Sequence, residues 1–186
     1  METLDNLNEP QKGTAIWDTV LRFGLYGGGA MVVFSLLTYL TEFNMMTIMG
    51  GITMFLMALL IAFGIAIFAI KHQRDKLDGG YINYGKALLV ALLAIILAMI
   101  ISGIWSFIFT NFIDPDYIVK LKDQFMETWG GKMPEEAMEQ TLESLEKAGE
   151  IGTSMFNAIK GGLVYGLIAS LITAGFMKRE QKPSYM

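Results

Sequence analysis

The sequence contains no cysteine and only one histidine among its 186 residues. Without cysteine, the chain has no disulfide, no thiolate nucleophile and no thiolate ligand for zinc or an iron–sulfur cluster. The single histidine, His72, has no second imidazole or cysteine with which to form a metal site. We therefore expect His72 to be a solvated loop residue, and we expect neither a metal nor a cofactor. Basic patches with interleaved aromatic side chains are also lacking, which argues against nucleic-acid binding.

Charged residues are scarce as well. They make up 17% of the sequence, whereas 53% is hydrophobic and the mean hydropathy is +0.46. This composition is typical of integral membrane proteins. A helix that crosses roughly 30 Å of hydrocarbon needs about 20 apolar residues. Four stretches satisfy this requirement, at about residues 20–40, 49–70, 87–112 and 156–177. The sequence therefore predicts an all-α, polytopic membrane protein, with a four-transmembrane-helix bundle that forms a single membrane domain over residues 1–186.

Lysine and arginine are distributed unevenly around these stretches. Basic residues in short flanking loops face the cytoplasm in membrane proteins. Those on one side of the predicted spans are Lys12, Arg22, Lys71, Arg74, Lys76, Lys86, Lys178, Arg179 and Lys182. Residues 113–155, on the other side, contain ten carboxylates and four lysines. We therefore expect both termini to be cytoplasmic and residues 113–155 to be extracytoplasmic.

Small residues recur along the predicted spans at steps of three or four. This spacing places them on one helix face, where they allow the backbones of neighbouring helices to approach closely in lipid. The helix-packing residues identified in this way are Gly24, Gly28, Ala58, Ala62, Ala66, Ala91, Ala98, Ser102, Gly162, Gly166, Ser170 and Ala174. We favour packing within one chain, and a homo-oligomer remains the alternative, because GxxxG pairs are common in membrane spans.

The segment after the third predicted span has the pattern of two short amphipathic helices. Asp114 is suited to cap the first helix, and Pro115 is suited to its first turn. Gly130 and Gly131 would end this helix, and Pro134 would precede a second, acidic one. We expect an amphipathic helical hairpin that covers the mouth of the bundle or lies in the headgroup layer, and a dedicated site for a ligand or partner is the alternative.

The predicted loop after the second span is basic. Lys71, Arg74 and Lys76 could contact anionic headgroups there, with each basic residue contributing on the order of 1 kcal/mol near the membrane surface. The positive-inside rule alone explains their presence equally well. Membrane lipids are one expected partner of the chain.

Several short motifs in this region and beyond it resemble a known bacterial family. They are Arg74-Asp75-Lys76, Gly79-Gly80-Tyr81-Ile82, Tyr84-Gly85-Lys86-Ala87, Asp114-Pro115-Asp116-Tyr117 and Phe176-Met177-Lys178-Arg179. The sequence resembles the domain of unknown function 4199 family. The resemblance implies a four-span inner-membrane protein of Gram-negative bacteria and supplies no activity. Gly79 and Gly80 remain candidates for a turn, and Asp114 and Pro115 for a helix start.

No residue pattern in the sequence indicates catalysis, because the carboxylate pairs lack accompanying nucleophile or metal-ligand motifs. We therefore expect a non-enzymatic accessory or structural component of the bacterial envelope, with an envelope protein as the partner of residues 113–155. One alternative is a small oligomeric carrier or channel for lipid or solute, which needs a polar path. Another is an enzyme that acts on envelope lipids or glycans, or a subunit of one, using Asp114, Asp116 or Arg74.

Overall fold

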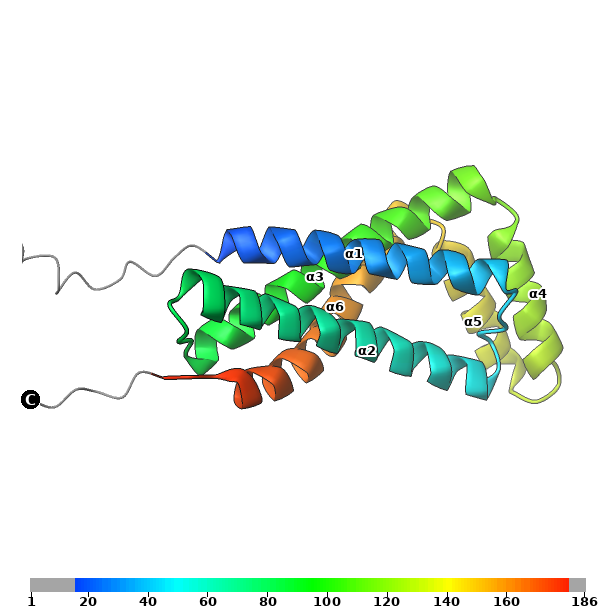
Figure 1. Ribbon diagram of the computed structural model, residues 1–186. Helices are drawn as coiled ribbons and strands as arrows, with labels where there is room; N and C mark the ends of the chain where they lie inside the picture. Colours follow the sequence, from blue (N-terminus) through cyan, green and yellow to red (C-terminus); the bar gives the residue numbers. More distant parts are fainter. Residues whose placement is uncertain (1–15, 181–186) are drawn as a thin grey trace, which may run out of the picture.

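The computed structural model describes residues 16–180, and this part of the chain is helical throughout apart from its connections. Four long helices pack together, and two short helices lie across one end of them (Figure 1). The long helices are α1 (Trp17–Leu40), α2 (Ile48–His72), α3 (Tyr84–Ile108) and α6 (Ile151–Met177), and the short ones are α4 (Tyr117–Trp129) and α5 (Glu135–Lys147). We call the end with α4 and α5 the insert end. The opposite end, where α1 begins and α6 ends, is the loop end.

The four long helices have the length and composition of membrane spans. They extend over Trp17–Leu40, Ile48–Leu77, Tyr84–Ile113 and Ile151–Met177, and their mean hydropathy lies between 1.5 and 3.0. Large apolar side chains on their outer surface are exposed; Leu25, Leu60 and Val164, for example, are each more than half exposed. Such a surface is suited to lipid rather than water. The prediction of an all-α chain with four apolar spans is confirmed.

The helices extend beyond the apolar stretches that predicted them. The side chain of Thr47 accepts a hydrogen bond from the Gly50 N–H at 2.9 Å and so caps α2, and Asn83 caps α3 in the same way. At their other ends, α2 and α3 continue as π-helical turns over Gln73–Leu77 and Phe109–Ile113. After α2, backbone hydrogen bonding therefore continues through polar residues that the hydropathy pattern had excluded, whereas the turn after α3 lies almost entirely within the predicted span. The fourth span likewise begins at Ile151, inside the segment that was expected to be extracytoplasmic.

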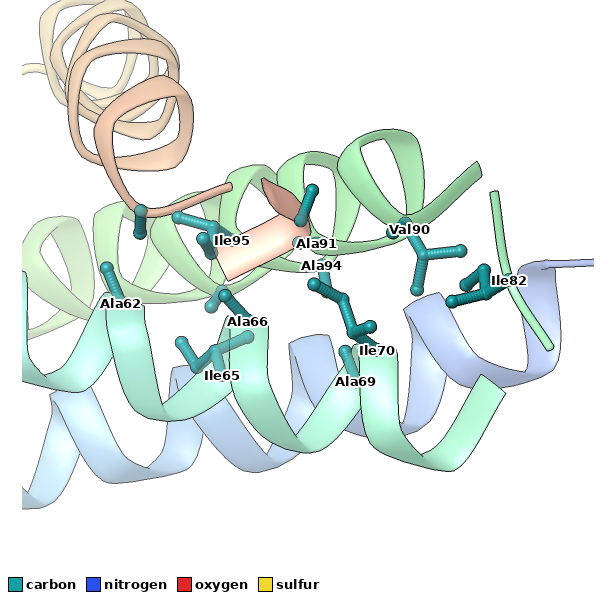
Figure 2. Packing of buried hydrophobic residues seen from close by; sticks show 14 of the residues in the cluster. Ala62, Ile65, Ala66, Ala69, Ile70, Ile82, Val90, Ala91, Ala94 and Ile95 are labelled. Atoms are coloured by element: carbon teal, nitrogen blue, oxygen red, sulfur yellow. The ribbon is translucent and has the colours of Figure 1, made fainter. Parts of the chain in front are cut away.

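Helix α3 is the central helix of the four. It packs against α1, α2 and α6, most extensively against α6 and α1. Four of its alanines, Ala87, Ala91, Ala94 and Ala98, are completely buried. Figure 2 shows how side chains of α2 meet those of α3 in the core. Because alanine is so small, three neighbouring helices approach α3 closely.

The predicted packing residues lie mostly at these contacts. Those that are buried are Gly24, Gly28, Ala62, Ala66, Ala91, Ala98, Gly162, Gly166, Ser170 and Ala174, whereas Ala58 and Ser102 are half-buried. Gly162 shows how close the approach is, because a Cβ atom added there would lie 3.1 Å from the Cα of Ile96 on α3. Gly166 faces α3 in the same way, at Leu92. This glycine pair therefore packs within the chain.

We predict that Gly162→Leu destabilises the protein by about 1–3 kcal/mol, because the backbone of α3 cannot move aside as a flexible side chain could. The midpoint of thermal unfolding in detergent should fall by several degrees. Gly175→Leu, on the same helix, is the matched control, since no atom lies within 4 Å of its added Cβ. Equal midpoints for the two variants would contradict the close α3–α6 contact.

Candidate functional site

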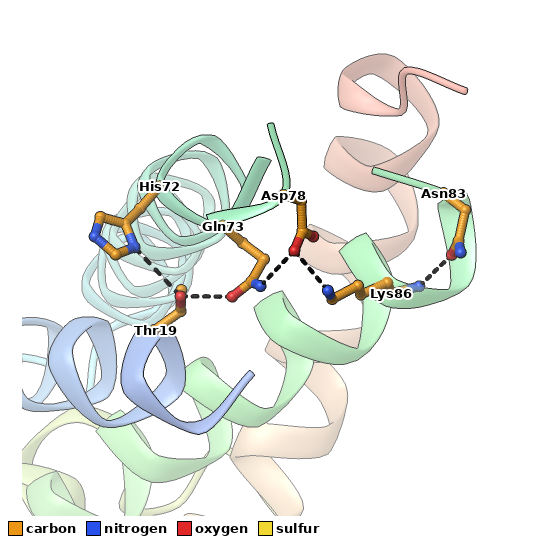
Figure 3. Close-up of polar contacts among 6 residues, drawn as sticks. All are labelled: Thr19, His72, Gln73, Asp78, Asn83 and Lys86. Atoms are coloured by element: carbon orange, nitrogen blue, oxygen red, sulfur yellow. Dashed lines mark hydrogen bonds and ion pairs between the residues drawn. The ribbon is translucent and has the colours of Figure 1, made fainter. Parts of the chain in front are cut away.

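A chain of polar side chains connects three helices at the loop end (Figure 3). The hydroxyl of Thr19 on α1 donates to Oε1 of Gln73 at 2.6 Å, and both side chains are completely buried. Gln73 Nε2 in turn donates to Oδ1 of Asp78 at 3.2 Å, and Nζ of Lys86 on α3 lies 2.7 Å from the same oxygen. Buried polar groups require such partners, because an unsatisfied one destabilises the fold by about 1–3 kcal/mol.

His72 lies beside this chain and is not the solvated loop residue that the sequence predicted. It is the last residue of α2 and is half-buried, and its ring centroid lies 5.3 Å from that of Phe23. Its Nδ1 is 3.3 Å from the hydroxyl oxygen of Thr19. Since the one hydrogen of that hydroxyl is donated to Gln73, a hydrogen bond here requires the proton on Nδ1 of His72. The prediction was wrong because α2 extends past its apolar stretch.

Arg74 joins the end of α2 to the end of α6. Its guanidinium donates to the carbonyl oxygen of Met177 at 3.2 Å. It also forms a bidentate ion pair with Asp75, in which Nε and Oδ1 are 2.6 Å apart. A cation at the carbonyl end of a helix is favoured by the helix dipole. Next to this contact, Ile82 and Arg179 exchange two backbone hydrogen bonds of 2.9 Å. The loop between α2 and α3 is thus fixed to α6.

The family-like motif at Gly79 and Gly80 forms the turn in this loop. Both residues have positive φ angles, 63° and 92°, which favour glycine. Lys71 and Lys76 on the preceding turns are exposed, and their contact with lipid headgroups stays a prediction. Arg74 differs from them, because 17% of its side chain is exposed and its guanidinium already has two protein partners.

Asp114 connects α1 to the start of α4 at the insert end. Its Oδ2 accepts hydrogen bonds from the hydroxyl of Tyr39 at 3.0 Å and from Nζ of Lys120 at 2.7 Å. The expectation that Asp114 and Pro115 begin the helix was wrong in detail, because α4 begins at Tyr117 and follows Asp116. A charge-assisted bond to an ammonium group is stronger than one to a backbone N–H, which explains why the carboxylate binds Lys120.

The surroundings of Asp114 combine this ion pair with aromatic packing. The hydrogen bond from Lys120, followed by that from Tyr39, holds the pKa of the Asp114 carboxyl below its ordinary value. The rings of Tyr39, Phe109 and Tyr117 pack edge to face below it, with centroids 4.9 to 5.9 Å apart. Burial raises the pKa of the Tyr117 hydroxyl. Aromatic pairs of this kind contribute about 0.5–1.5 kcal/mol beyond their buried area.

Two further hydrogen bonds fix the segment of α4 and α5 to the spans. The indole Nε1 of Trp129 donates to the carbonyl oxygen of Met46 in the connection between α1 and α2, at 2.8 Å. Asn111, at the end of α3, donates to the carbonyl oxygen of Gly149 just before α6, also at 2.8 Å. An ion pair of 3.0 Å between Lys122 and Glu146 joins α4 to α5. The two short helices are therefore held at several separate points.

Helix α5 places acidic side chains on the outside of this segment. It has no buried residue, and its apolar side chains are half-buried at most. We call its exposed carboxylates the acidic face, which consists of Glu135, Glu136, Glu139, Glu143 and Glu146. Glu143 pairs with Lys147, and Glu146 pairs with Lys122. Within residues 16–180, no three carboxylates or histidines are grouped closely enough to hold a metal ion.

Sequence reasoning missed the partners of these polar residues. Gln73 stood in a basic stretch and Trp129 on an apolar face, and neither position indicates what the side chain binds. Thr19 and Gln73 are 54 residues apart, and Met46 and Trp129 are 83 residues apart. Contacts at such separations depend on how the helices pack, so no spacing rule could have found them.

The lowered pKa of Asp114 predicts a pH dependence of stability. A carboxyl whose pKa is lower in the folded than in the unfolded state contributes stability above its unfolded pKa, and the contribution is lost as the pH falls through the folded value. We expect Asp114→Asn to melt below wild type at neutral pH, and the difference to begin to shrink near pH 3.8, the ordinary value for aspartate, and to disappear as the pH falls through the lower pKa of the folded state. Asp116→Asn, which replaces an exposed carboxylate two residues away, is the control. A difference in melting midpoint that persists unchanged in acid would contradict the role of the charge.

Comparison with known proteins gives a family and no activity. Searches of curated proteins and of solved structures found no match to this chain. The family model described as "Protein of unknown function (DUF4199)" matches residues 22–179, which include all four long helices almost completely. The match confirms the resemblance that the loop motifs carry, and the chain belongs to the DUF4199 family of proteins of unknown function.

Proposed function

We propose that this protein is a non-enzymatic accessory or structural component of the bacterial inner membrane, and that its acidic face binds another envelope protein. The observation that carries the proposal is the position of this face on α5. The five glutamates are exposed on a helix pair that is fixed to the spans through Asp114, Trp129 and Asn111. A surface held in place in this way loses little conformational entropy when a partner binds.

The orientation of the chain is part of the proposal. In the described residues, the basic side chains of Arg22, Lys71, Lys86 and Lys178 belong to the loop end, while the carboxylates of α5 belong to the insert end. The positive-inside rule then puts the loop end in the cytoplasm. In this orientation, the spans form a four-helix bundle with both termini cytoplasmic, and α4 and α5 form an extracytoplasmic amphipathic hairpin.

The chemistry of the acidic face indicates the kind of partner. Glu135, Glu136 and Glu139 make no ion pair with any other described residue, so their charge is available to a ligand. A basic segment of an envelope protein would be attracted by this charge, which raises the association rate and makes binding sensitive to salt. We therefore expect the partner to present a positively charged segment on the extracytoplasmic side of the inner membrane.

Two of the three side chains named for the enzyme alternative, Arg74 and Asp114, are engaged elsewhere in the fold. An enzyme on envelope lipids that used Arg74 or Asp114 would need these side chains to reach a substrate. Arg74 is bound to Asp75 and to the carbonyl of Met177, and Asp114 is bound to Tyr39 and Lys120. A carrier or channel needs a polar path, whereas the core cluster of the packed helices is apolar and rich in alanine, valine and isoleucine, with Ser170 and Thr173 as buried hydroxyls on α6. The accessory function needs only the acidic face of α5, whose carboxylates are exposed.

We predict that the double substitution Glu136→Gln and Glu139→Gln reduces partner binding several-fold, because it removes two unpaired carboxylates from the acidic face. The measurement is photo-crosslinking from a probe at Gln140 on α5, followed by mass spectrometry of the captured proteins. The matched control is Asp116→Asn with Glu127→Gln, which removes two exposed carboxylates near or on α4.

The proposal requires that the same envelope proteins be captured by wild type and by the control. Capture should be lost in the α5 double variant and should weaken as salt is added. If wild type and both variants capture the same proteins equally, the acidic face is not the binding surface and the proposal is wrong.

A further inference from the structure

A cleft of about 510 Å³ opens at the insert end, separate from the acidic face. It lies between the C-terminal end of α1 with the residues that follow it and the first half of α4. Its lining includes apolar side chains, among them Leu40, Phe43 and Leu121. It also includes the polar side chains of Glu42 and Gln124. A cleft with both kinds of lining at the end of a span is suited to an amphiphilic ligand.

The first sign that this cleft is a binding site is the backbone of Glu42. Within residues 16–180, Glu42 is the one residue other than glycine with a positive φ angle, 50°. It follows α1, where the N–H of Glu42 bonds to the carbonyl of Tyr39 and the N–H of Phe43 to that of Thr38. This pair of bonds is the Schellman motif, in which glycine is the favoured residue at the position of Glu42. A glutamate of the cleft lining therefore occupies a position that favours glycine.

The second sign is a buried acceptor. The side-chain oxygen Oε1 of Gln124, a cleft residue, is buried and has no hydrogen-bond partner in the described part of the chain. Buried polar atoms without partners are rare, and each one that occurs calls for an explanation such as an absent ligand or water. An amide oxygen can only accept hydrogen bonds, so the missing partner is a donor.

The charges around the cleft indicate which donor fits. Its lining contains the carboxylates of Glu42 and Asp123 and one cation, Lys120. Since Lys120 is paired with Asp114, the two carboxylates of the lining are not neutralised by it. The cleft therefore favours a cationic donor. About half of the Lys120 side chain is exposed, so its ammonium group remains accessible to an anionic oxygen of the same ligand.

We propose that this cleft binds the headgroup of an ethanolamine phospholipid. The primary ammonium pairs with Glu42 and Asp123, and Gln124 turns its buried Oε1 toward the cleft to accept a hydrogen bond from it. The adjacent phosphate lies near Lys120, and the acyl chains run along the apolar lining at Leu40 and Leu121. This inference is independent of the protein partner proposed for α5, because the two surfaces share no residue.

The test is lipid retention by the purified full-length protein, measured by native mass spectrometry from detergent that contains equimolar phosphatidylethanolamine, phosphatidylglycerol and phosphatidylcholine. We expect wild type to retain phosphatidylethanolamine at least tenfold over the other two lipids. Phosphatidylcholine carries a cation without N–H donors, so it separates hydrogen bonding from charge. Free phosphoethanolamine, added in a parallel experiment, distinguishes the headgroup from the whole lipid.

The decisive variant is Glu42→Gly. It should lose the preference for phosphatidylethanolamine. Its melting midpoint should equal or exceed that of wild type, because glycine adopts the positive φ angle at this position without strain. Glu127→Gln, on α4 outside the cleft lining, should keep the preference. Equal retention of the three lipids by wild type, an unchanged preference in Glu42→Gly, or displacement of the lipid by an equal concentration of free phosphoethanolamine would each overturn the proposal.

Discussion

In lipid, apolar burial does little to bring helices together, because lipid tails are as apolar as leucine, so association relies on close packing of small side chains. In this protein that constraint is met around α3. Its buried alanines share one core cluster with side chains of α2, and glycines of α1 and α6 lie directly against it at Leu97 and Ile96. The remaining structure depends on this contact, because the positions of α1, α2 and α6 determine where both ends of the spans lie.

Small side chains allow close approach but do not specify how far one helix slides along another. Polar contacts at the two ends supply that information. Thr19 and Gln73 fix α1 against α2 at the loop end, and Tyr39 and Asp114 fix α1 against the start of α4 at the insert end. A misaligned helix would leave the buried side chains of Thr19 and Gln73 without partners, which destabilises the fold by about 1–3 kcal/mol for each group. The position of the acidic face and the shape of the cleft both follow from this alignment.

The sequence predicts the spans and their packing faces well, because hydropathy and the spacing of small residues act locally. Helix ends are predicted less well. Capping by Thr47 and Asn83 and the π-helical turns depend on single side chains and on backbone hydrogen bonds, and His72 was misplaced as a result. The cleft was not predictable at all, since it joins residues near 42 to residues near 124 and depends on the backbone angle of Glu42. Asp114 was recognised as a structural residue, but its partners were not.

The central claim is that the spans hold α4 and α5 in place on the extracytoplasmic side of the membrane. Because the chain has no cysteine, single cysteines can be introduced without background labelling. The most direct measurement is labelling of Gln140→Cys on α5 and Lys76→Cys at the loop end with a membrane-impermeant maleimide in spheroplasts. The account predicts that Gln140→Cys reacts in intact spheroplasts and that Lys76→Cys reacts only after the membrane is permeabilised. The opposite pattern would contradict the orientation and, with it, the proposed envelope partner.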